Sequence, residues 1–224
     1  MTFMIDVGYN ITCRRPRIGV NFLQRGHTTR TLATYWRSEG IQMSRQLLLM
    51  RHAKSDWKDS TLNDKERPLN SRGRTAAPVM AKWLIQHDHV PDLVLCSSAI
   101  RTQQTLDLMI HHWTTMKQVD AALALPQVII EEPLYLASDL AILRSARHCG
   151  TVETKRCIMM LGHNPGMEIL ASKLSGNTIR MPTGAIAILV SDSPDGDWPA
   201  DWEDANLWKW RGLVKPRELS SETI

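Results

Sequence analysis

The stretch that decides the fold is Gln46-Leu47-Leu48-Leu49-Met50-Arg51-His52, a short apolar run that ends in two polar side chains able to carry positive charge. A continuous apolar run of this length is typical of a strand covered on both faces. Ligands of such sheets bind beyond the carboxyl ends of the strands, so Arg51 and His52 mark a possible site. Taken alone, an Arg-His pair in a loop is more often only solvated.

Segments of strand and helix character alternate outward from this run. The apolar patterns predict strands over 93–96, 128–130, 157–161 and 185–190. They predict helices over about 71–85, 98–112, 139–147 and 166–175. A Trp-rich stretch, 198–210, is expected to be a strand beside 185–190 at one sheet edge. This alternation predicts an α/β fold, a three-layer α/β/α sandwich with a mostly parallel central sheet.

The positive charge of the chain is concentrated near its beginning. The formal net charge is +4, yet residues 1–45 alone contribute +5 and the remainder −1. The folded body is therefore close to neutral, and the basic character gives no indication of a nucleic-acid partner. We expect residues 1–42 to be an N-terminal extension, either disordered or not native, ahead of a domain over 43–224. An organellar transit peptide and a basic arm for an acidic partner are the alternatives.

The cysteines and the hydropathy pattern bear on the compartment. The four cysteines form no CxxC pair and no recurrent spacing, so we expect neither a disulfide framework nor a zinc site. No apolar stretch approaches the roughly 20 residues that span a bilayer. We therefore expect a cytoplasmic monomer that acts on neither membranes nor nucleic acid.

Two further apolar runs lead into groups able to carry positive charge. Arg101 follows the run 93–96 at a short interval, and His163 follows 157–161. If these strands are parallel neighbours of the first, Arg51, His52, Arg101 and His163 converge on one crevice. Such a cluster is an anion site, and a phosphoryl group suits it because the arginine fork can hold two of its oxygens. The alternatives are a surface arginine at 101 and a turn histidine at 163. The histidines have no familiar metal-ligand spacing, so we expect no metal.

Three motifs resemble the histidine phosphatase superfamily, which includes the cofactor-dependent phosphoglycerate mutases. Met50-Arg51-His52-Ala53-Lys54-Ser55 resembles its Arg-His signature, and Ser97 to Thr105 resembles its second motif, with Arg101 four residues after Ser97. Gly162-His163-Asn164-Pro165-Gly166 resembles the third motif. Together with the first motif, Arg67-Pro68-Leu69-Asn70-Ser71-Arg72-Gly73 is similar to the SixA-type branch of phosphohistidine phosphatases. The resemblance spans about residues 43–220 and implies a phosphoglycerate mutase-like fold.

The resemblance also implies roles for single residues. His52 would attack phosphorus and form a phosphohistidine intermediate, while Arg51, Arg101 and His163 hold the phosphoryl oxygens. No cofactor and no metal are implied, because the cations serve that purpose. The expected substrate-binding residues are Lys54, Ser55, Arg67, Gly162 and Asn164.

The leaving group divides the possible functions. Hydrolysis of a phosphate ester needs an acid near the site, and Glu132 after the third strand is the candidate proton donor, with Asp56 and Asp59 as further options. Equally, Glu132 can be a solvated side chain at a strand end. A phosphohistidine substrate relaxes this need, because its imidazole can leave already protonated. We therefore expect a metal-independent phosphatase for phosphohistidine on a phosphotransfer or phosphocarrier protein. The alternatives are a phosphatase for a small phosphate ester and, from another class, a phosphate-binding protein without catalysis.

Overall fold

Strand β1 (Gln46–Arg51) lies inside a six-stranded sheet of order β3-β2-β4-β1-β5-β6. The structure, a computed structural model, describes residues 44–193 and 197–219, so the predictions made for residues 1–42 fall outside it. The other strands are β2 (Leu93–Ser97), β3 (Gln127–Glu131), β4 (Cys157–Gly162), β5 (Ile186–Ser191) and β6 (Trp208–Val214). The helices are α2 (Ser71–Gln86), α3 (Ile100–Lys117), α4 (Asp139–His148), α5 (Gly166–Ser175) and α6 (Pro216–Leu219).

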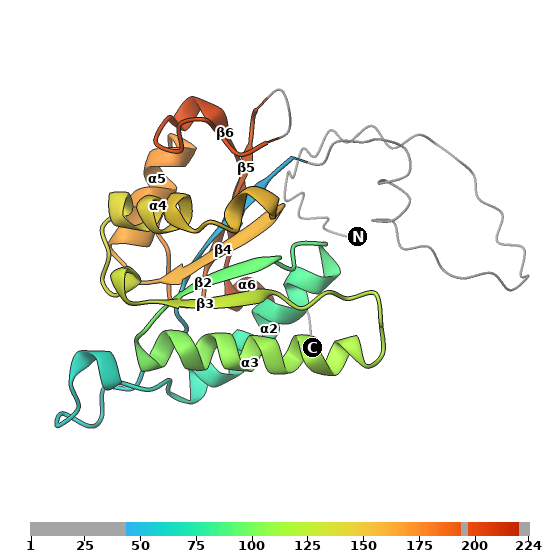
Figure 1. Cartoon of the computed structure of the whole chain (residues 1–224). Helices are drawn as coiled ribbons and strands as arrows, with labels where there is room; N and C mark the ends of the chain where they lie inside the picture. The colour runs from blue at the N-terminus through green and yellow to red at the C-terminus, as the bar shows by residue number, and fades with distance from the viewer. Residues whose placement is uncertain (1–43, 194–196, 220–224) are drawn as a thin grey trace, which may run out of the picture.

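The pairing of the strands confirms a mostly parallel sheet. The first four strands in sequence pair in parallel, β1 with β4, β4 with β2 and β2 with β3. β5 is antiparallel to its neighbour β1, and β6 at the edge is antiparallel to β5, so β6 runs in the same direction as the first four strands. Because β1 and β4 are direct parallel neighbours, the chain leaves both strands at the same end of the sheet (Figure 1).

Alternate side chains of β1 enter two separate cores. Leu47 and Leu49 face α4 and α5, and Leu48 and Met50 face α2 and α3; all four are fully buried. Figure 1 shows these two pairs of helices on opposite faces of the sheet. The predicted three-layer α/β/α sandwich is therefore confirmed, and the apolar run 47–50 is continuous because both of its faces are covered.

The start of α2 is held against the loop that follows β1. Asn70 caps the helix by accepting a hydrogen bond from the backbone N–H of Gly73 at 3.0 Å. The backbone N–H of Asn70 donates to the carbonyl of Lys54 at 3.0 Å. A Cβ at position 73 would lie 2.2 Å from that same carbonyl oxygen, so only glycine permits this approach. The motif 67–73 thus fixes the residues that come directly after His52.

The Trp-rich stretch differs from its prediction. Only residues from Trp208 onward form a strand, β6, while 198–207 are irregular with one short 3-10 turn. The indoles of Trp198, Trp202 and Trp208 pack on one another with ring centroids 4.9 to 6.4 Å apart, and all three are buried. Their mutual packing, and indole N–H bonds from Trp198 to the carbonyls of Val152 and Lys155, replace strand pairing there.

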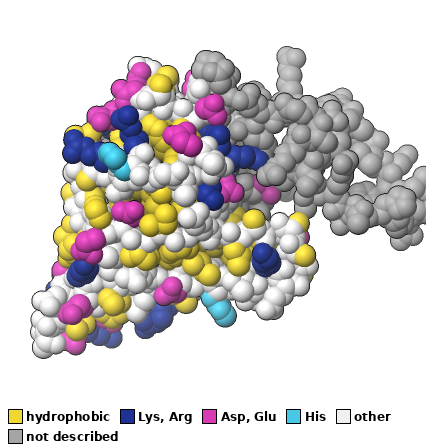
Figure 2. Space-filling model, in the orientation of Figure 1, with side chains coloured by type: hydrophobic (Ala, Val, Ile, Leu, Met, Phe, Trp, Pro, Cys, Tyr) yellow, Lys and Arg dark blue, Asp and Glu magenta, His cyan; other side chains and the backbone are white. Residues whose placement is uncertain are grey.

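The surface agrees with a near-neutral body. Figure 2 shows acidic and basic side chains interspersed over the face it draws, without a continuous basic patch. Across residues 44–193 and 197–219, no helix combines the length and the apolar character that a membrane crossing requires.

Candidate active site

The ends of β1 and β4 bring two histidines together. Arg51 and Gly162, the last residues of these strands, are partners in the parallel register. The backbone N–H of His52 donates to the Gly162 carbonyl at 3.0 Å, and His163 is the residue directly after Gly162. The ring centroids of His52 and His163 are therefore only 5.2 Å apart.

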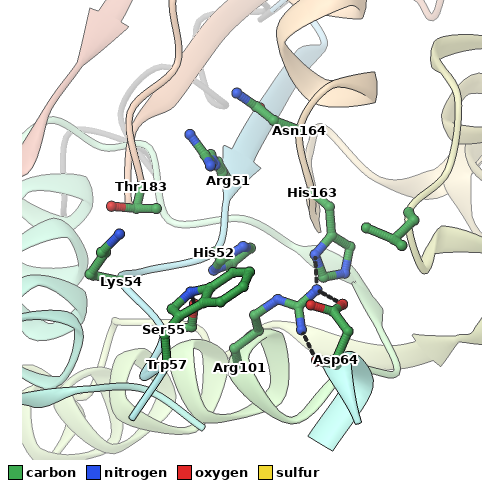
Figure 3. Close-up of a pocket in the computed structure, with 11 residues that line it drawn as sticks. Arg51, His52, Lys54, Ser55, Trp57, Asp64, Arg101, His163, Asn164 and Thr183 are labelled. Carbon is green, nitrogen blue, oxygen red and sulfur yellow. Dashed lines mark hydrogen bonds and ion pairs between the residues drawn. The ribbon is translucent and has the colours of Figure 1, made fainter. Parts of the chain in front are cut away.

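These histidines line a cavity of about 320 Å³ at this edge of the sheet. Figure 3 shows the guanidinium of Arg101 beside His163 and Asp64, with Arg51 at the end of β1 and His52 directly after it. The cavity combines cationic, polar and apolar groups; its lining consists of Arg51, His52, Lys54, Ser55, Trp57, Asp64, Arg101, Leu136, His163, Asn164 and Thr183.

His52 presents an unprotonated nitrogen to this cavity. Its Nδ1 lies 2.6 Å from the carbonyl oxygen of Ala53, which can only accept, so Nδ1 carries the proton. Burial lowers the pKa of His52 to about 4, and the charges of Arg101 and Arg51 act in the same direction. At neutral pH the ring is therefore neutral, with its lone pair at Nε2.

His163 is neutral as well, in the opposite tautomer. A guanidinium nitrogen of Arg101 lies 3.2 Å from Nδ1 of His163 and can only donate, so Nδ1 accepts. Its Nε2 then donates to the Ser97 hydroxyl at 2.8 Å. Burial lowers the pKa of His163 to about 3, with further contributions from His52 and Arg101. The sequence suggested a positive charge at 163, whereas in this structure the ring is an uncharged, fixed support for Arg101.

Asp64 holds Arg101 from the other side. A guanidinium nitrogen of Arg101 donates to the Asp64 carboxylate at 2.8 Å, and a second donates to its backbone carbonyl. The Tyr135 hydroxyl donates to the same carboxylate oxygen at 2.9 Å. Burial by itself would raise the pKa of Asp64, but the hydrogen bonds from Tyr135 and Arg101 lower it overall. The carboxylate is thus ionised at neutral pH.

Arg51 is held from the loop before β5. One of its guanidinium nitrogens donates to the Met181 carbonyl at 2.8 Å, and the amide of Asn164 donates to that carbonyl at 3.1 Å. Arg51 Nε and Asn164 Oδ1 are buried without a hydrogen-bond partner among the described residues. Such atoms next to a polar cavity are suited to contact a ligand.

The spacing of four in the second motif has a structural reason. Ser97 ends β2 and contacts His163, Arg101 lies in the first turn of α3, and Thr105 is one turn further on. The hydroxyl of Thr105 accepts from the backbone N–H of Ala53 at 3.1 Å. One helix face therefore supplies the cavity with Arg101 and fixes the residue that follows His52.

Three predicted site residues do not line the cavity. Glu132 is exposed, and Lys65 Nζ lies 2.5 and 2.7 Å from its two oxygens. That hydrogen bond lowers the pKa of Glu132, which is the opposite of what a proton donor at neutral pH requires. Gly162 contributes its carbonyl to His52 from behind, and Arg67 stacks on Trp57 at 3.8 Å. The further options, Asp56 and Asp59, bond to their own loop outside the cavity lining.

Four residues that line the cavity were not predicted from the sequence, namely Trp57, Asp64, Leu136 and Thr183. Asp64 had no distinguishing signal, because it is one of several charged residues in the loop between β1 and α2. Trp57 offered one, since a large aromatic residue in a polar loop is unusual. Within the part of the chain that the structure describes, no group of three or more His, Cys, Asp or Glu side chains could hold a metal ion.

Comparison with known proteins identifies the family. The model of the histidine phosphatase superfamily (branch 1) matches residues 47–124. An uncharacterized chloroplastic protein of Arabidopsis thaliana is 32% identical over 199 residues, which cover 84% of this chain and 85% of that protein. The chain belongs to the histidine phosphatase superfamily and is a phosphatase of that class.

Solved structures share its fold at lower identity. The protein histidine phosphatase SixA in complex with tungstate has a TM-score of 0.60 at 22% identity, covering 78% of this chain and 99% of that one. A proposed α-ribazole-5′-phosphate phosphatase from Escherichia coli has a TM-score of 0.50 at 16% identity, covering 67% of this chain and 92% of that one. The fold is therefore phosphoglycerate mutase-like, as the motifs implied.

Proposed function

We propose that the protein hydrolyses the phosphorus–nitrogen bond of phosphohistidine on a phosphotransfer or phosphocarrier protein, through a phosphoryl group carried transiently by His52. The observation that carries the proposal is the state of the ionisable groups in the cavity. Its one carboxyl group among the described residues, that of Asp64, is ionised, while His52 offers a free base nitrogen. The site therefore has a nucleophile but no carboxylic acid ready to protonate a leaving group.

The nucleophile is the Nε2 atom of His52. A neutral imidazole can attack phosphorus, whereas an imidazolium cannot, so a pKa near 4 keeps the reactive form populated at neutral pH. The proton on Nδ1 is held by the Ala53 carbonyl at 2.6 Å, which aims Nε2 into the cavity. As Nε2 gains its bond to phosphorus, that carbonyl stabilises the positive charge that develops on the ring.

The charge of the cavity matches a phosphoryl dianion. Arg51, Lys54 and Arg101 contribute three formal positive charges and Asp64 one negative charge, a balance of +2 with both histidines neutral. The arginine nitrogens are held at fixed positions by Met181 and by Asp64 before any ligand arrives. Such preorganised cations stabilise the charge on the equatorial oxygens without the cost of reorientation. Tungstate is a tetrahedral oxyanion like phosphate, and its complex with SixA supports this use of the shared fold.

Two displacements complete the reaction. In the first, Nε2 of His52 bonds to phosphorus, the bond from phosphorus to the substrate nitrogen breaks, and its electron pair stays on the leaving imidazole. In the second, a water oxygen attacks phosphorus, the electron pair of the bond to His52 returns to Nε2, and the water proton ends on the phosphate. The leaving imidazole can be protonated beforehand, so the first step requires no acid from Asp64 or Glu132.

A comparison of substrates tests the proposal. A phosphotransfer domain phosphorylated on histidine and a panel of phosphate esters are offered to the wild type, and kcat/KM is measured for each. We expect the phosphohistidine protein to exceed the best ester by at least 100-fold. An ester that matches or exceeds it would instead make the protein a small-molecule phosphatase, the alternative that the α-ribazole-5′-phosphate phosphatase fold relative represents.

The covalent step is tested separately. Rapid denaturation in alkaline detergent preserves the acid-labile phosphorus–nitrogen bond, so a radiolabelled phosphoryl group on the enzyme can be counted. Wild type should be labelled during turnover, and His52→Ala should not. Equal labelling of both proteins would refute His52 as the nucleophile, and phosphate binding without turnover would favour the non-catalytic alternative.

A further inference from the structure

Trp57 is an unusual residue at the mouth of the cavity. It lines the cavity together with His52, yet 63% of its surface is exposed to solvent. Burial of an indole usually stabilises a fold, and Trp198, Trp202 and Trp208 are all buried in this one. Aromatic side chains that line a ligand cavity commonly supply apolar contact to the ligand.

The indole is held in one orientation. Its Nε1–H donates to the hydroxyl of Ser55 at 3.1 Å, and Ser55 is itself buried and bridged to Leu69. The guanidinium carbon of Arg67 lies 3.8 Å from the centre of the indole ring. Arg67 is mostly buried, and its Nε has no hydrogen-bond partner among the described residues but lies 3.9 Å from Asp64 Oδ1. The ion pair with Asp64 and the contact with the indole together hold the guanidinium.

These contacts leave one planar face available. Arg67 covers one side of the ring, and Ser55 takes its only hydrogen-bond donor, so the exposed side can offer no directional polar contact. Figure 3 draws the indole next to Arg101 in this view, and both side chains line the cavity. A flat, apolar, preoriented face beside the phosphoryl-binding cations is suited to another flat ring.

We infer that Trp57, with Arg67 behind it, is a stacking platform for the ring of the leaving group, and that it makes the enzyme select phosphoryl groups attached to planar rings. This inference rests on the proposed function, because it assigns the imidazole of phosphohistidine to the platform. Phosphoryl groups on an open-chain nitrogen, as in phospholysine, gain nothing from it. Trp57 is thus a specificity-determining residue.

Small substrates isolate the effect of the ring. N-phosphoimidazole and phosphoramidate both release a nitrogen leaving group, but only the first leaves as a ring. For each, the ratio of kcat/KM between wild type and Trp57→Ala cancels the intrinsic reactivity. We expect a loss of about tenfold with phosphoimidazole and less than about twofold with phosphoramidate, as aromatic pairs typically contribute. Trp57→Phe should retain activity on phosphoimidazole to within about threefold.

Two controls separate stacking from a structural role. Inorganic phosphate occupies the cations without a leaving group, so its inhibition constant should be the same in wild type and Trp57→Ala. Leu136 also lines the cavity and is 53% exposed, so Leu136→Ala removes apolar surface without removing a planar face. It should change both substrates by the same factor. An equal loss on both substrates in Trp57→Ala, or weakened inhibition by phosphate, would overturn the inference.

The failure of the proposed function would remain distinguishable. If the wild type hydrolyses esters but neither nitrogen compound, the phosphohistidine assignment fails while the platform is still tested, with phenyl phosphate and ethyl phosphate as the pair. A selective loss on phenyl phosphate in Trp57→Ala would then support a stacking platform for aryl esters. If the wild type hydrolyses phosphoimidazole and Trp57→Ala shows no selective loss, the platform fails and the proposed function stands.

Discussion

Replacing His52 by glutamine should make the protein less sensitive to mild acid. Burial lowers the pKa of this histidine to about 4 in the folded chain, whereas an unfolded histidine has a pKa near 6.5. Between these values the unfolded chain binds the proton and the folded chain does not. Wild type therefore loses stability through this group as the pH falls from about 6.5 toward 4, and His52→Gln has no such group to protonate.

The magnitude follows from the two pKa values. Each pH unit between them is worth about 1.4 kcal/mol, so the full interval corresponds to about 3 kcal/mol. Between pH 7 and pH 4.5 the loss is about 2 kcal/mol, a considerable fraction of the stability of an ordinary domain. The lowered pKa of Asp64 acts in the same direction but only at lower pH, because that carboxylate protonates below its usual range.

Urea unfolding at pH 7 and pH 4.5 measures this difference. The free energy of unfolding of wild type minus that of His52→Gln should fall by about 2 kcal/mol between the two conditions, and groups that do not interact with His52 cancel. His111→Gln, which removes an exposed histidine, is the control for the substitution itself. An NMR titration of the His52 ring in wild type gives the pKa independently. A change below about 0.5 kcal/mol, or a ring that titrates above pH 6, would refute a buried neutral nucleophile.

Three further predictions concern the supports of the site. Arg101→Lys should lower kcat/KM about 100-fold, because an ammonium cannot bond to Asp64, His163 and a phosphoryl oxygen at fixed angles; steady-state kinetics would show it. Gly73→Ala should lower the free energy of unfolding in urea by about 1–3 kcal/mol, because the added methyl group would lie 2.2 Å from the Lys54 carbonyl oxygen. Gly150→Ala is the control: nothing lies within 4 Å of its added methyl group, so the free energy of unfolding should change by less than about 0.5 kcal/mol. Thr105→Val should lower the free energy of unfolding by about 1–3 kcal/mol, because the buried N–H of Ala53 loses its acceptor. Thermal denaturation measures this loss, and Thr115→Val, at an exposed position, is the control.

The sheet and the four groups that meet at its edge could be predicted because their signals are local. A run of apolar residues reveals a strand buried on both faces, and the polar residue after it must lie at the strand end. For β1 and β4 this reasoning sufficed, because the two strands are neighbours and His52 and His163 follow them directly. The motif spacing of Arg101 added the first turn of α3.

The position of Glu132 relative to His52 could not be predicted from a local pattern. Glu132 too follows a strand, but β3 is an edge strand, on the opposite side of the sheet from β6, and two strands lie between β3 and β1. At about 4.8 Å per strand, the end of β3 is about 14 Å from the end of β1. Strand order depends on long-range packing that no local pattern encodes. The position of Glu132 after the third strand therefore did not reveal how far it lies from His52. The loop residues Asp64 and Trp57 were missed for the same reason, since the fold of the loop between β1 and α2 decides which of its side chains turn inward.

The same loop explains how the site can use a base without an acid. Asp64 accepts hydrogen bonds from both Arg101 and Tyr135, and these keep its carboxylate ionised. An ionised carboxylate at this position orients the Arg101 guanidinium, which in the proposed function binds the phosphoryl group, but it cannot release a proton to an alkoxide at neutral pH. If Asp64 were neutral, Arg101 would lose a charged partner, so the two roles exclude each other in one residue. A leaving group that carries its own proton resolves this conflict, and the imidazole of phosphohistidine is such a group.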